Sequence, residues 1–138
     1  LGCRSVSKIF VPVNYNFDLL FNALFKFNDI INVKKYENNY DYNKAIYLMS
    51  LFKIQDNGFV MLKEDSALFS PLSVLNFSRY ESVEEVHAFL VENESNIQCV
   101  VAKPELGIEN SVNFGEAQNP SLNTYADNID TMAFLSVV

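Results

Sequence analysis

Short apolar runs, separated by polar residues, dominate the first quarter of the chain. Residues 8–13 (KIFVPV) are apolar nearly throughout, which predicts a strand covered on both faces. Pro12 has no N–H to donate to a ladder, so we expect the strand to end near it. A helix is predicted next, with Asn16 as its N-cap. Its apolar face would carry Phe17, Leu20, Phe21, Leu24 and Phe27.

The middle of the chain is more polar. Residues 28–42 are rich in Asn and predict a loop, with a short strand over 30–33. Residues 43–51 predict a short helix. Asp56-Asn57-Gly58 is a turn signal, and residues 59–63 predict the strand that follows it.

The second half again alternates strand and helix patterns. Residues 72–77 predict a strand after Pro71, and Ser82 with Glu85 has the spacing of a capping box. The helix that it opens carries Val83, Val86 and Leu90 on one face, with His87 at the border of that face. Residues 97–102 (IQCVVA) predict another covered strand, with Cys99 in the core. This order predicts an α/β fold with a mainly parallel sheet flanked by helices.

Composition narrows the class of protein. The 138 residues are 49% hydrophobic, which favours one domain with a real core. No apolar run approaches the ~18 residues of a membrane span, and no segment resembles a signal peptide, so we expect a cytoplasmic protein. The net charge of −7 disfavours nucleic acid as a partner. With two cysteines and one histidine, a structural zinc site is not expected.

The ends of the chain carry two further expectations. It begins Leu1-Gly2-Cys3, without an initiator Met, and enters a strand almost at once. We therefore expect residues 1–138 to be a single piece of a longer polypeptide. Residues 132–138 are apolar and suited to pairing with a neighbouring subunit or with the rest of that polypeptide.

Two stretches resemble the catalytic region of aldehyde dehydrogenases. In residues 2–17, Cys3 precedes basic residues, an apolar strand and an amphipathic helix, as the nucleophilic cysteine of that family does. Lys8 stands where the family usually has Arg. Residues 67–71 (ALFSP) resemble the family's Glu-x-Phe-Gly-Pro motif, and they too precede a strand and a helix that opens with two glutamates.

Several phrases are closer to one branch, the LuxC-like acyl-CoA reductases. These phrases are residues 38–44 (NNYDYNK), 70–75 (SPLSVL), 114–118 (FGEAQ) and 125–131 (YADNIDT). The resemblance implies the C-terminal, thiol-bearing portion of an aldehyde-dehydrogenase-like catalytic domain. It also implies assembly into a homo-oligomer.

The activity implied by the resemblance is reduction of a long-chain fatty acyl thioester to an aldehyde, with NADPH as the cofactor. Cys3 would attack an acyl-CoA or acyl-protein donor as a thiolate and hold the acyl group as a thioester. The Cys3 backbone N–H would be one donor to the oxyanion. Phe69 would pack near the nicotinamide ring of NADPH, with Ser70 and Pro71 shaping the same wall.

The sequence also departs from the family. Ala67 occupies the position of the family Glu that holds the nicotinamide ribose. The nucleotide-binding domain and the general-base Glu would lie upstream of Cys3, so we expect the 138 residues alone to be inactive in turnover. Two alternatives stay open: a CoA-acylating aldehyde dehydrogenase for short aldehydes, and a non-catalytic oligomerisation module.

Overall fold

The computed structural model describes residues 4–121, 124–125 and 129–136. By its internal contacts the chain divides into two compact units. The sheet unit is Val6–Glu81, and the helical unit combines Leu1–Ser5 with Ser82–Val138. In the part of the chain that the structure describes, no helix is long and apolar enough to cross a membrane.

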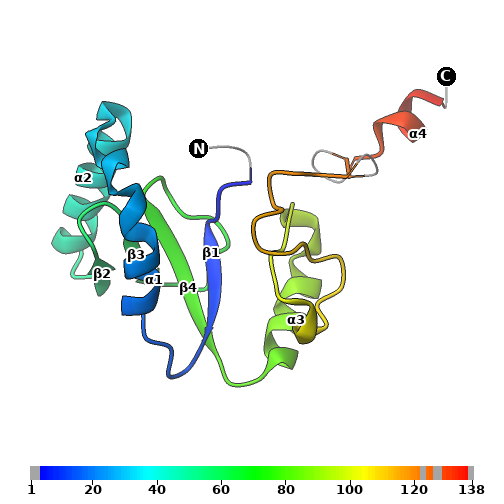
Figure 1. Cartoon of the computed structure of the whole chain (residues 1–138), viewed down its shortest axis with the longest axis horizontal. Helices are drawn as coiled ribbons and strands as arrows, with labels where there is room; N and C mark the ends of the chain where they lie inside the picture. Colours follow the sequence, from blue (N-terminus) through cyan, green and yellow to red (C-terminus); the bar gives the residue numbers. More distant parts are fainter. Residues whose placement is uncertain (1–3, 122–123, 126–128, 137–138) are drawn as a thin grey trace. The chain divides into compact units, whose positions relative to one another are not determined.

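The sheet unit is built on four strands in the order β1-β4-β3-β2 (Figure 1). They are β1 (Lys8–Pro12), β2 (Ile54–Asp56), β3 (Met61–Glu64) and β4 (Val74–Tyr80). β4 pairs in parallel with both β1 and β3, whereas β2 pairs antiparallel with β3. The predicted α/β fold with a mainly parallel sheet is confirmed at this level.

One face of the sheet is apolar and packs against α1 (Asp18–Leu24). Successive residues of a strand point to opposite faces, and this face collects the odd-numbered residues of β1 and β4 together with Leu62. Its core consists of Val11, Phe17, Leu62 and Phe77, with Ile9, Tyr15, Leu20, Phe21 and Leu75 packed around them. At the start of α1 the Asn16 side chain accepts the Asp18 N–H at 2.8 Å, although Phe17 holds the N-cap position itself.

The second apolar cluster forms against α2 (Lys34–Met49) and includes Tyr40, Met61 and Val74. The buried stripe of α2 is unusual because it consists of Tyr36, Tyr40 and Asn43. Each of these side chains reaches a different backbone or side-chain partner. Tyr36 donates to the Phe59 carbonyl at 2.8 Å, Tyr40 to Asp56 Oδ1 at 2.6 Å and Asn43 to the Leu72 carbonyl at 2.9 Å.

This arrangement corrects the prediction for the middle of the chain. The predicted loop over residues 28–42 is wrong, because α2 begins at Lys34 and runs to Met49. The predicted strand over 30–33 is also wrong, because a 3-10 helix, η1 (Phe25–Asn32), occupies that stretch. Phe27 lies exposed on η1 rather than in the apolar face. The helical spacing was hidden because the buried side chains of α2 are tyrosines and an asparagine, not aliphatic residues.

The predicted turn at residues 56–58 is confirmed. Gly58 has φ +95, and Asp56 Oδ1 accepts its N–H at 2.9 Å. β2, on the other side of this turn, has no counterpart among the predicted elements. The strand predicted over 72–77 starts two residues later, at Val74, because Ser73 has φ +70, a left-handed conformation that interrupts a strand.

The helical unit contains α3 (Val83–Glu92), two short 3-10 helices, η2 (Glu94–Asn96) and η3 (Pro104–Leu106), and α4 (Thr131–Ser136). α3 confirms the helix predicted after Ser82, and Val86 is buried on it. The capping box is wrong in detail, since Ser82 occupies the N-cap without a side-chain cap hydrogen bond.

The strand predicted over residues 97–102 is wrong. Among the described residues, this stretch forms an isolated bridge between Val101 and Val112, and the pairing does not extend into a strand. Cys99 is consequently half-buried rather than a core residue.

The first prediction concerns the core of the sheet unit. Leu62 is 0% exposed, whereas Leu19 on α1 is 67% exposed. Leu62→Ala should lower the free energy of unfolding by about 2–5 kcal/mol because it removes buried methyl groups and leaves a cavity. The matched Leu19→Ala should change it by less than about 0.5 kcal/mol. Urea denaturation of both variants checks the difference, and equal effects would contradict this core.

The second prediction concerns acid stability. Burial alone would raise the pKa of Asp56, but hydrogen bonds from Lys44, Tyr40 and the Gly58 N–H outweigh it and hold the pKa below its ordinary value. Lys44 Nζ lies 2.6 Å from Asp56 Oδ2. Because the folded pKa is lowered, this stabilisation is present above the unfolded pKa of about 3.9 and is lost as the pH falls through the folded value.

Asp56→Asn should therefore reduce stability at neutral pH and flatten its decline below about pH 4. Asp41→Asn, an exposed control on α2, should leave the curve unchanged. Denaturation midpoints measured from pH 2 to 7 make the comparison. An acid limb as steep in Asp56→Asn as in the wild type would contradict this assignment.

Candidate functional site

A group of polar side chains lies on the sheet face opposite α1. Lys8 on β1 and Asn76 on β4 are partners in the parallel register, and so are Lys63 on β3 and Asn76. Ser78 follows Asn76 on the same face of β4. The loop 65–73, which connects β3 to β4, bonds to these side chains. It is shorter than the dozen or so residues that a parallel crossover usually takes, so its path back along β4 is tightly constrained.

Lys8 ties this loop to β1. Its Nζ donates to the Asp65 carbonyl and, at 2.6 Å, to Ser78 Oγ. The ammonium also lies 5.5 Å from the centroid of the Phe10 ring. Burial lowers the pKa of Lys8, and the charge of Asp65 opposes that effect. Lys8 thus joins the first strand of the sheet to the end of the third.

Asp65 begins the loop with a fixed geometry. Its Oδ2 lies 2.5 Å from Lys63 Nζ, and its Oδ1 accepts the Ala67 N–H at 2.9 Å. The hydrogen bond from Lys63, followed by that from Ala67, lowers the pKa of the Asp65 carboxyl. The loop therefore leaves β3 through an Asx turn, in which the Asp65 carboxylate accepts the N–H two residues further on.

Asn76, on the sheet, holds the centre of the loop by hydrogen bonds to its backbone. It is 3% exposed, and its Nδ2 donates to two carbonyls, those of Ala67 at 3.1 Å and Phe69 at 3.0 Å. The far end is closed by Ser70, whose hydroxyl donates to the Val74 carbonyl at 2.6 Å. The Val74 N–H in turn donates to the Pro71 carbonyl at 3.1 Å.

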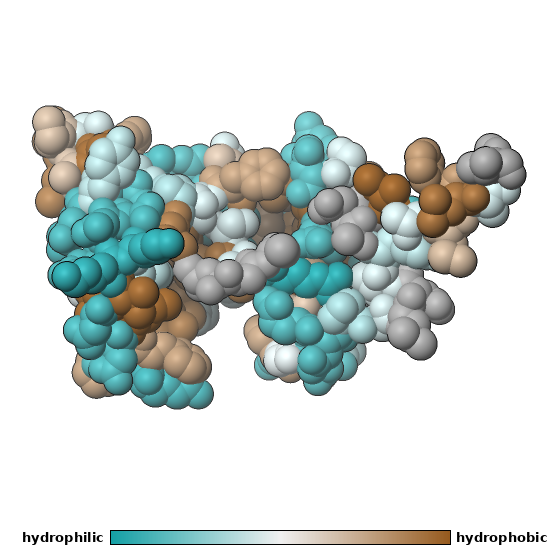
Figure 2. Space-filling model, turned by 90° about the horizontal axis from the view of Figure 1, so that it is seen from above, coloured by the Kyte–Doolittle hydropathy of each residue, from teal (hydrophilic) through white to brown (hydrophobic). Residues whose placement is uncertain are grey.

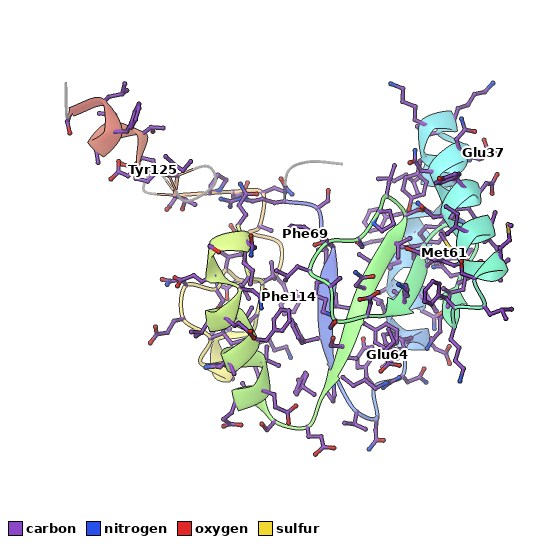
Figure 3. All side chains as sticks on the ribbon, turned by 180° about the vertical axis from the view of Figure 1, so that it is seen from behind. Glu37, Met61, Glu64, Phe69, Phe114 and Tyr125 are labelled. Atoms are coloured by element: carbon purple, nitrogen blue, oxygen red, sulfur yellow. The ribbon has the colours of Figure 1, made fainter. Side chains whose placement is uncertain are left out.

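Phe69, Ser70 and Pro71 are consecutive residues of this loop. Figure 3 labels Phe69 on it. Phe69 is 71% exposed although its backbone carbonyl is bonded. Ser70 is half-buried and uses its hydroxyl within the loop, so it stabilises the turn into β4. Pro71 is exposed. The loop can therefore offer an aromatic ring to a planar or apolar group.

Cys3, the predicted nucleophile, lies outside the described residues. Its neighbour Arg4 is described, and its Nη1 donates to the Ala117 carbonyl at 3.1 Å. Ala117 belongs to residues 114–118 (FGEAQ), one of the stretches that resemble the LuxC-like branch. Within the helical unit, two stretches far apart in the sequence and both part of the resemblance are therefore bonded to each other.

The sheet unit also has two shallow hollows that the loop does not line. One, of about 250 Å³, lies between η1 and the turn at residues 57–59. The other, of about 430 Å³, lies at the carboxyl ends of β1 and β4. Among the described residues, no group of three or more His, Cys, Asp or Glu side chains could hold a metal ion.

Sequence reasoning missed the residues that support the loop. Asn76 and Ser78 are polar positions two residues apart that alternate with Leu75 and Phe77, and that spacing is the signal that could have found them. A buried polar side chain needs a partner, so two on one face of a strand indicate a covering segment with free backbone groups. The partners themselves depend on the register of β1, β3 and β4.

The fold and the loop define a mixed α/β protein with an exposed aromatic on a loop held by hydrogen bonds. No family model, no curated protein and no solved structure matches the chain. The resemblance to acyl-CoA reductases therefore rests on the residues quoted above.

The third prediction concerns Lys8. Lys8→Met removes the donor shared by the Asp65 carbonyl and Ser78, and it should lower the free energy of unfolding by about 1–3 kcal/mol. Lys35→Met, which changes an exposed lysine of α2, should alter it by less than about 0.5 kcal/mol. Urea denaturation compares the two variants. A Lys8→Met protein as stable as the control would show that this lysine does not hold the loop.

Proposed function

We propose that the chain is the thiol-bearing part of an NADPH-dependent long-chain acyl-CoA reductase. In this proposal Cys3 accepts the acyl group. Phe69, Ser70 and Pro71 belong to the wall against which the nicotinamide ring packs. The donor is a fatty acyl-CoA or an acyl-protein, and both present the same thioester carbonyl.

The pairing of β1 with β4 is the observation that carries the proposal. The segment that leads from Cys3 enters the sheet at β1, and the segment that carries Phe69 enters it at β4. These strands are adjacent and parallel, and the Ser7 carbonyl accepts the Asn76 N–H at 3.0 Å. Asn76 also bonds the Phe69 carbonyl. The two stretches of the resemblance thus lead into neighbouring strands, β1 and β4, in which Lys8 and Asn76 are register partners.

A second observation comes from the helical unit and is independent of the sheet. Arg4 follows Cys3 directly and bonds to Ala117 in the FGEAQ phrase. A reductase of this kind needs the chain beside its nucleophile to be held in place, because acyl transfer requires the thiolate and the carbonyl to meet in a defined geometry. The bond from Arg4 is suited to that role.

The residues present fit one end of NADPH. Phe69 offers an exposed ring on a supported loop, and an aromatic face suits a planar nicotinamide. The chain's four glycines are scattered at positions 2, 58, 107 and 115, so no glycine-rich phosphate loop accompanies it. The phosphates and the adenosine would be held by another part of the protein.

The first chemical step belongs to Cys3. Its thiolate attacks the thioester carbonyl carbon and forms a new C–S bond. The C–S bond to CoA then breaks, CoA leaves as a thiolate that takes up a proton, and the acyl group stays on Cys3 as a thioester. NADPH, when bound, supplies the hydride that reduces this carbonyl. Cys3 then leaves as a thiolate, and the product is an aldehyde.

The fourth prediction tests the proposal directly. Incubation of the 138-residue chain with a long-chain acyl-CoA should add one acyl group at Cys3, and hydroxylamine should remove it because thioesters are labile to that nucleophile. Intact-mass and peptide mass spectrometry locate the modification. Cys3→Ala should abolish it, whereas the matched Cys99→Ala should keep it.

Undiminished labelling of Cys3→Ala would contradict the assignment of the nucleophile. A comparison of short and long acyl chains decides between the proposed reductase and a CoA-acylating aldehyde dehydrogenase for short aldehydes. A much faster reaction with short chains would favour the latter.

A non-catalytic assembly module is the second candidate function, and one observation favours it. α4 exposes Met132, Phe134 and Leu135, and Figure 2 shows apolar side chains gathered at that end of the chain. Several exposed apolar side chains on one short helix suit contact with another protein surface. If Cys3 reacts neither with acyl-CoA nor with iodoacetamide, this candidate replaces the reductase.

A further inference from the structure

We propose that Asn76 is a positioning residue that fixes the backbone under Phe69 and so holds the Phe69 ring ready for the nicotinamide group. The inference rests on the proposed function for the identity of that group. The role of Asn76 in ordering the loop is independent of the proposed function.

Burial of the Asn76 amide in β4 costs free energy unless the amide finds hydrogen-bond partners. Its neighbours along β4, Leu75 and Phe77, are apolar, and Asn76 itself is almost completely buried. A buried amide without partners is unfavourable by several kcal/mol, on the order of 2–7 by transfer measurements. The Nδ2 group donates to Ala67 and Phe69, and both acceptors lie in the one loop. The side chain is therefore matched to that loop.

The backbone around Phe69 is held by hydrogen bonds, whereas its ring is exposed. Hydrogen bonds from Asn76 hold the carbonyls at positions 67 and 69, and Ser70 closes the turn that follows. The phenyl ring nevertheless remains 71% exposed. An aromatic side chain on an ordered backbone loses little conformational entropy when a ligand packs on it. Exposure with order is the arrangement that a binding wall needs.

Asn43 provides a matched control within the same unit. It is also a buried asparagine, 7% exposed, and its Nδ2 also donates to a carbonyl of the 65–73 loop, that of Leu72. It bonds beyond Pro71 and leaves the 67–69 stretch untouched. A general loss of stability would affect both asparagine variants alike, whereas a positioning role separates them.

The decisive experiment measures backbone order in the full 138-residue chain. Amide ¹⁵N order parameters of residues 67–69 should be about 0.85 in the wild type and fall below about 0.6 in Asn76→Leu, which keeps the branched arrangement of heavy atoms but lacks the donors. Asn43→Leu should keep them near the wild-type value. Unchanged order in Asn76→Leu would overturn the inference.

A second variant guards against a folding failure. Asn76→Ser keeps one O–H donor in a smaller side chain, so it should give an intermediate loss of order at residues 67–69. If Asn76→Leu does not fold, Asn76→Ser decides the question by the same measurement. Wild-type order in that variant would count against the proposal.

Titration with reduced nicotinamide mononucleotide, followed by the chemical shifts of the backbone amides at positions 67–69, tests what the wall binds. Phe69→Ala, which removes the ring that the probe packs against, and Asn76→Leu, which removes the hydrogen bonds that position it, should each weaken binding roughly tenfold. The double variant should be no weaker than either single one, because Asn76 acts through Phe69. Asn43→Leu should bind as the wild type does. Additive losses in the double variant would overturn the positioning role.

The two proposals fail in different ways. Absence of acylation at Cys3 of the wild-type chain contradicts the reductase but leaves the order of residues 67–69 as a separate result. An ordered loop that depends on Asn76 but does not bind the nicotinamide probe overturns the ring assignment for Phe69. Loop order independent of Asn76 overturns the positioning role itself.

Discussion

The parallel pairing of β1 with β4 is the interaction on which the sheet unit depends. It joins residues 8–12 to residues 76–80, the first and last strands of that unit in sequence. One face of the pair contributes Val11 and Phe77 to the core beneath α1. The other face brings Lys8 beside Asn76, and these two side chains hold the 65–73 loop from two strands. Without this register the apolar core and the candidate site would both lose their support.

Buried polar groups form the second organising element. Tyr36, Tyr40 and Asn43 attach α2 through one hydrogen bond each, at three separate points of the sheet unit. Asn76 and Ser78 do the same for the loop. In each of these five side chains a hydrogen bond to a defined partner offsets the cost of burial. Such bonds specify geometry more sharply than apolar contact does. This explains how a short crossover can expose Phe69 on an ordered backbone.

These features also explain how far the sequence allowed prediction. Apolar runs, turn residues and helical spacing were enough to predict β1, the 56–58 turn, β3, most of β4 and α3. α2 was missed because tyrosines and an asparagine occupy its buried stripe. The strand at residues 97–102 was predicted from its apolar run, but a strand also needs a partner, and in the described part of the chain the pairing there is limited to the bridge with Val112.

The candidate site was predictable in part. Phe69, Ser70 and Pro71 came from a resemblance and lie on one loop, whereas Cys3 stays a prediction. The roles of Lys8 and Asn76 depend on strand register, which no local pattern specifies.

Both the apolar core and the support of the loop depend on the β1–β4 pairing. Native-state hydrogen exchange of the Asn76 amide, which donates to the Ser7 carbonyl, tests that pairing most directly. We predict that this amide exchanges only with global unfolding of the sheet unit, together with that of Met61. Exchange through a local opening of much lower free energy would contradict the account.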